Sequence, residues 1–75
     1  MRDKLITFIN SLVTEKEKRF FTDSVIDSII YNLKEDGWEI GIEAIVEEGL
    51  KNQASNERRK FITGSIVKAM EDLNR

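Results

Sequence analysis

The chain has 75 residues and a formal net charge of −2, and it contains no cysteine, histidine or proline. This length has room for one domain, and the missing residue types exclude disulfides, thiolate zinc sites and histidine proton shuttles. The slightly acidic balance argues against general nucleic-acid affinity, because such binding depends on a surplus of lysine and arginine that neutralises phosphates.

The first predicted helix covers residues 2–13. Its apolar side chains recur at intervals of three and four residues, which places them on one face of an α-helix. These residues are Leu5, Phe8, Ile9, Leu12 and Val13. We expect this face to lie against the core of the protein.

The second predicted helix has two possible starts. Thr14 followed three residues later by Glu17 is the pattern of a capping box, in which each side chain bonds the backbone of the other residue. Thr22 and Asp23 are also good N-caps, and a helix that begins there would leave residues 16–21 as a connection. With either start, one apolar face is formed by Phe21, Val25, Ile26, Ile29, Ile30 and Leu33.

Gly37 is predicted to end the second helix in a left-handed conformation, so that a third helix runs from Trp38 to about Lys51. Asp36 and Glu39 could instead form a capping box. That arrangement would make Gly37 helical, and we favour the glycine as terminator. The apolar residues that the third helix turns inward are Trp38, Ile42, Ile45, Val46 and Leu50.

Two glycines lie on the same side of the third helix. Gly41 and Gly49 each cost about 1 kcal/mol relative to alanine in a helix interior. A cost of this size indicates close packing, because the missing side chains would let the backbone of another helix approach. We expect that approach to come from within this fold rather than from a partner.

A fourth helix is predicted from its N-cap Ser55 to about Leu73, after a polar link that begins at Asn52. Its apolar residues are Ile62, Ile66, Ala69, Met70 and Leu73, with Phe61 beside them. No segment alternates long enough to predict a strand. The sequence therefore predicts an all-α fold, a compact bundle of about four helices in a single domain of residues 1–75.

The sequence contains two short basic clusters. The first consists of Lys16, Lys18 and Arg19, and the second consists of Arg58, Arg59 and Lys60. The second cluster lies near the positive end of the fourth helix, where the helix dipole disfavours cations. Neither cluster has interleaved aromatic residues, so a solvated surface is favoured over a phosphate or nucleic-acid site.

Acidic side chains line one face of the third helix. Glu39, Glu43 and Glu47 follow one another at four-residue spacing, with Glu35 and Asp36 close to the start of the helix. A metal site is not expected, because ligands would have to converge from several helices and such bundles use histidines that this chain lacks. The face is therefore either solvated or a negative surface for a basic partner.

Trp38 is expected to anchor the third helix in the core, although tryptophan is also enriched at binding hot spots. It completes the set of candidate partner-binding residues, which are Glu35, Asp36, Trp38, Glu39, Glu43 and Glu47.

The stretch Gly37–Ile45 resembles a motif of small Maf-type immunity proteins. The motif reads as an acidic residue, Trp or Tyr, two variable positions, Ala, Leu, Glu, any residue and Leu. The matching positions are Trp38, Ile42, Glu43 and Ile45, whereas Gly37 replaces the acidic residue and Gly41 replaces the alanine. The resemblance implies an all-helical protein that binds and neutralises a cognate bacterial toxin.

The leading functional prediction is therefore an immunity-type inhibitor with no cofactor and no catalysis of its own. Its acidic face would suit a toxin with a basic, nucleic-acid-cutting site. The alternative is a phage-derived or regulatory protein-interaction module, or a homodimer formed through its apolar surface. No segment resembles a secretory signal or has the roughly 18 apolar residues that span a bilayer, so a cytoplasmic location is expected.

Overall fold

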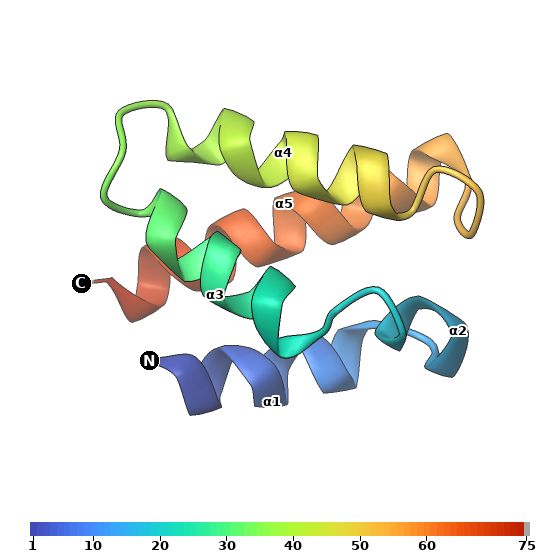
Figure 1. Cartoon of the computed structure of the whole chain (residues 1–75), viewed down its shortest axis with the longest axis horizontal. Helices are drawn as coiled ribbons and strands as arrows, with labels where there is room; N and C mark the ends of the chain where they lie inside the picture. The colour runs from blue at the N-terminus through green and yellow to red at the C-terminus, as the bar shows by residue number, and fades with distance from the viewer. Residues whose placement is uncertain (75) are drawn as a thin grey trace.

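The computed structural model describes residues 1–74, and all regular secondary structure in this range is α-helical. The helices are α1 (Arg2–Leu12), α2 (Glu15–Lys18), α3 (Asp23–Asn32), α4 (Trp38–Gly49) and α5 (Asn56–Leu73). The four longer helices form a ring in which α1 and α4 each contact both α3 and α5 (Figure 1). The predicted all-α bundle of about four helices is confirmed, and the short α2 is the fifth helix.

The additional helix exists because both of the proposed starts are used. Thr14 Oγ1 accepts a hydrogen bond from Glu17 N at 3.2 Å, and Glu17 Oε1 accepts one from Thr14 N at 2.9 Å, so the capping box begins α2. Thr22 Oγ1 then accepts a hydrogen bond from Val25 N at 3.4 Å and begins α3. The connection expected at residues 16–21 is therefore partly helical.

Gly37 has the predicted left-handed conformation, with φ of 74°. Its place is different from the expected one, because α3 already ends at Asn32 and Gly37 is instead the residue that precedes α4. No side chain caps the start of α4, so the alternative capping box of Asp36 and Glu39 is not formed. The intervening residues form a loop in which the chain reverses its direction between α3 and α4 (Figure 1).

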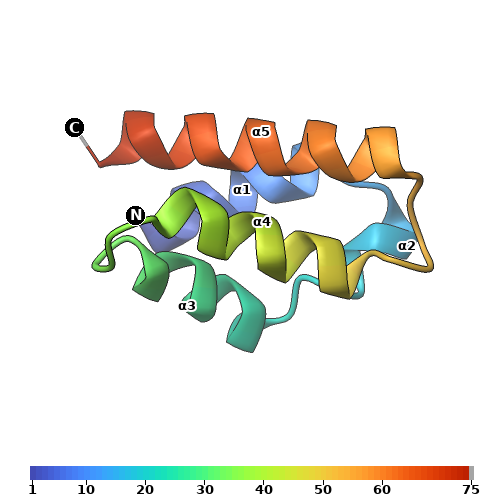
Figure 2. The same ribbon diagram turned by 90° about the horizontal axis from the view of Figure 1, so that it is seen from above.

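The core lies inside the ring of four helices, and α5 runs along both α1 and α4 (Figure 2). Its buried apolar residues are Leu5, Ile9, Phe21, Ile26, Ile29, Ile42, Val46, Leu50, Ile62, Ile66 and Met70. Full burial of such a side chain stabilises the folded state by about 1.5–3 kcal/mol. Trp38 is partly buried and packs against this core from the first turn of α4.

The two glycines of α4 mark close contacts within the fold, as expected, but the approaching groups are side chains and not the backbone of another helix. A Cβ atom on Gly41 would lie 2.7 Å from Oδ1 of Asn32, in the last turn of α3. A Cβ atom on Gly49 would overlap the ring of Phe20, which lies between α2 and α3. Gly64 in α5 is different, because nothing lies within 4 Å of the position of its Cβ.

We predict opposite effects for two glycine-to-alanine substitutions. Gly49→Ala forces the Phe20 ring to move and should lower the free energy of unfolding by about 1–3 kcal/mol. Gly64→Ala adds a methyl group in open space within a helix and should raise it by about 0.5–1 kcal/mol. Urea denaturation of both variants measures the difference, and equal effects would contradict the assigned contact at Gly49.

Candidate protein-binding surface

The outer face of α4 is an exposed strip with an apolar residue at its centre. Glu39, Ile40, Glu43 and Ala44 are all exposed, and Ile40 is 73% exposed. Neither carboxylate of this strip has a salt-bridge partner among residues 1–74. We call these four residues the α4 strip.

The other predicted acidic residues divide into two groups. Glu35 and Asp36 are exposed in the turn that precedes α4, next to the α4 strip in the chain. Glu47 is instead partly buried and paired, because its Oε2 accepts a hydrogen bond from Nε of Arg59 at 2.8 Å. Arg59 Nη1 also donates to the backbone oxygen of Ala54 at 2.7 Å. The structure therefore does not bring all the predicted carboxylates into one free surface.

Trp38 does not belong to the exposed strip. Its side chain is partly buried and packs on the core, which agrees with its expected role as an anchor of this helix. A partner that binds the α4 strip would contact Ile40 as the large apolar residue, whereas Trp38 anchors the helix by packing against the core.

Arg58 forms the most buried ion pair among the described residues. Its Nε donates to Glu17 Oε2 at 3.0 Å, and its Nη2 donates to Glu17 Oε1 and to the backbone oxygen of Leu12, both at 2.9 Å. Glu17 is only 4% exposed. The hydrogen bonds from Arg58 lower the pKa of Glu17 to about 2 against the opposing effect of burial, and the same pair raises the pKa of Arg58.

These two arginine pairs were not predicted from the sequence. The one available signal was the position of Arg58 and Arg59 at the positive end of α5, where cations are disfavoured unless another group compensates them. Glu17 and Glu47 provide that compensation. The second basic cluster is therefore largely occupied within the protein and is not a free phosphate site.

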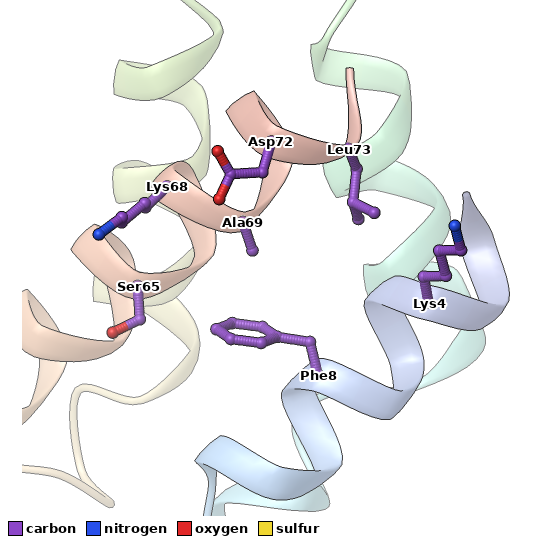
Figure 3. Close-up of a pocket in the computed structure, with 7 residues that line it drawn as sticks. All are labelled: Lys4, Phe8, Ser65, Lys68, Ala69, Asp72 and Leu73. Atoms are coloured by element: carbon purple, nitrogen blue, oxygen red, sulfur yellow. The ribbon is translucent and has the colours of Figure 1, made fainter. Parts of the chain in front are cut away.

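A groove of about 460 Å³ lies between α1 and α5 (Figure 3). Its lining residues are Lys4, Phe8, Ser65, Lys68, Ala69, Asp72 and Leu73. In the close-up, Phe8 lies across the groove beneath Ala69, while Lys4 and Leu73 flank its other end (Figure 3). The centre of the groove is therefore apolar, and its edges carry both signs of charge.

The described part of the chain has no helix that is both long and apolar enough to cross a membrane. Within residues 1–74, no group of three or more acidic side chains is arranged to hold a metal ion. Comparison with models of known protein families, with curated proteins and with solved structures gives no match to this chain. The resemblance to Maf-type immunity proteins stays a prediction from the residues of the Gly37–Ile45 stretch.

The Glu17–Arg58 pair predicts that stability falls in acid. A carboxylate whose pKa is lowered from 4.5 to about 2 stabilises the fold above about pH 5, and this contribution is lost as the pH falls towards 2. The full contribution is about 3 kcal/mol, since one pKa unit corresponds to about 1.4 kcal/mol. Glu17→Gln should therefore be less stable than the wild type at pH 7, and the difference should shrink towards pH 2.

The matched control is Glu15→Gln, two residues away, because the side chain of Glu15 is 91% exposed. Urea denaturation at pH 7, 4 and 2.5 measures all three proteins. A constant deficit of Glu17→Gln across this range would mean that the ion pair is not the source of the pH dependence.

Proposed function

We propose that this chain is a cytoplasmic, immunity-type binding protein that catalyses no reaction and inhibits a basic toxin by covering it with the α4 strip. The observation that carries the proposal is the exposed Ile40 between the free carboxylates Glu39 and Glu43. An apolar centre with a polar rim is the usual anatomy of a protein interface.

Charge distribution supports a basic partner. The positive charges of Arg2, Arg58 and Arg59 are paired with carboxylates inside this chain. The carboxylates of the α4 strip are not paired in this way, so the strip presents unbalanced negative charge. Complementary charge accelerates association and suppresses partners of the wrong sign.

The inhibitory role is supported by the resemblance of Gly37–Ile45 to Maf-type immunity proteins. This stretch includes the first two turns of α4 and therefore the centre of the α4 strip. A toxin that cuts nucleic acid has a basic site for phosphates, and a carboxylate-rich helix face would compete for that site.

The proposal is tested by reversing charge on the α4 strip. Wild-type protein is immobilised and used to capture a partner from its host, and the partner is then purified and assayed for toxicity with and without this protein. Glu39→Lys combined with Glu43→Lys should weaken binding at least tenfold and abolish protection, because attraction becomes repulsion. Wild-type affinity should also fall with added salt, since exposed charges are screened over about 10 Å at 0.1 M.

The matched control is Glu15→Lys combined with Glu71→Lys, which lies outside both the α4 strip and the α1–α5 face. It changes the net charge equally, and Glu15 is in the first turn of α2 as Glu39 is in the first turn of α4. Thermal melts confirm that both variants fold. Equal binding by the two double variants would remove the α4 strip from the interface, and a captured partner without toxicity would reject the inhibitory role.

A further inference from the structure

The groove between α1 and α5 belongs to a longer open face. Lys4 lines the groove near Asp72 and Leu73, whereas the carbonyl at the other end of α1, that of Leu12, is bound by Arg58 near the start of α5. The two helices are therefore antiparallel, and the groove occupies only the part of their shared face near the C-terminal end of α5 (Figure 3).

Phe61 projects from the remaining part of this face. It lies four and seven residues before Ser65 and Lys68, so the three residues share one side of α5. Phe61 is 55% exposed, and the guanidinium of Arg58 lies 5.5 Å from the centre of its ring. The face therefore has the exposed ring of Phe61, in contact with Arg58, at one end and the apolar groove at the other.

We propose that this face is the interface of a symmetric homodimer in which Phe61 of each copy fills the α1–α5 groove of the other. Phe61 and the groove residue Ala69 are eight residues apart, which is about 12 Å along the helix. A two-fold axis at Ser65, midway between them, pairs each projection with the opposite groove. Closed dimers with a self-complementary contact are the commonest symmetric assembly.

Small residues at the axis allow the two α5 helices to approach. Ser65 lies on the shared face, and beside it Gly64 is exposed with nothing within 4 Å of its Cβ position. A large side chain at either position would hold the helices apart. These two small residues therefore place no bulky side chain at the crossing point that the two-fold axis requires.

The charges on this face favour a second copy over a partner of uniform charge. Lys4 and Asp72 flank the groove, and neither has a salt-bridge partner among residues 1–74. A strongly acidic or basic partner would repel one of them. The proposed axis instead places Glu57 of the second copy near Lys4, so that the two opposite charges attract each other.

The dimer is independent of the proposed function, because the α4 strip lies outside this interface. Sedimentation equilibrium over a wide concentration range should show a reversible dimer for the wild type. Phe61→Asp should be monomeric throughout that range, whereas Ile40→Asp, which changes an even more exposed apolar residue on α4, should remain dimeric. A monomeric wild type, or loss of the dimer in Ile40→Asp alone, would overturn the proposal.

A complementation experiment tests the geometry. Lys4→Glu and Glu57→Lys should each weaken the homodimer at least tenfold. Each substitution gives residues 4 and 57 the same charge, and the two-fold axis repeats this repulsive contact twice in the dimer. Mixed together they should form a heterodimer with near wild-type affinity, because both contacts are then attractive. Circular dichroism verifies folding of each variant, and failure of the mixture to associate more tightly than either variant alone would reject the proposed pairing.

Discussion

The ion pair between Glu17 and Arg58 connects three parts of the chain that no continuous element joins. Glu17 belongs to the single turn α2, Arg58 to the start of α5, and the guanidinium also binds the carbonyl of Leu12 at the end of α1. The side chain of Arg58 therefore connects α1, α2 and α5 at the end of the bundle where α2 follows α1. An isolated turn as short as α2 is not stable in water, because helix nucleation costs more than one hydrogen bond returns.

The capping box of Thr14 and Glu17 is coupled to the ion pair between Glu17 and Arg58. Glu17 uses Oε1 both to accept from Thr14 N and to accept from Arg58, so the capping box fixes the carboxylate that the arginine binds. Burial of a charged pair is favourable only when its remaining hydrogen-bonding groups are satisfied. The capping box and the Leu12 carbonyl satisfy them, and this explains how a carboxylate can be almost fully buried in so small a protein.

Internal use of the arginines determines which surfaces remain for partners. With Arg58 and Arg59 directed at carboxylates of α2 and α4, the start of α5 is no longer a free cationic patch. The free carboxylates are left on the outer face of α4, while Arg58 also supports the ring of Phe61 on the α1–α5 face. The proposed toxin-binding strip and the proposed dimer face thus lie on different helices, and a dimer would present two α4 strips.

The sequence by itself determined the features that act over three or four residues. Helical periodicity predicted the apolar faces, the Thr14–Glu17 spacing predicted the capping box, and Gly37 predicted the left-handed turn, because each depends on local backbone geometry. Only the tertiary structure decided that Glu17 binds Arg58, 41 residues away in the sequence, and that Glu47 binds Arg59 and is therefore not a free carboxylate like Glu39 and Glu43. Amphipathic faces specify that helices pack but not which neighbours they take, so the free and the occupied charges became distinguishable only in the folded bundle.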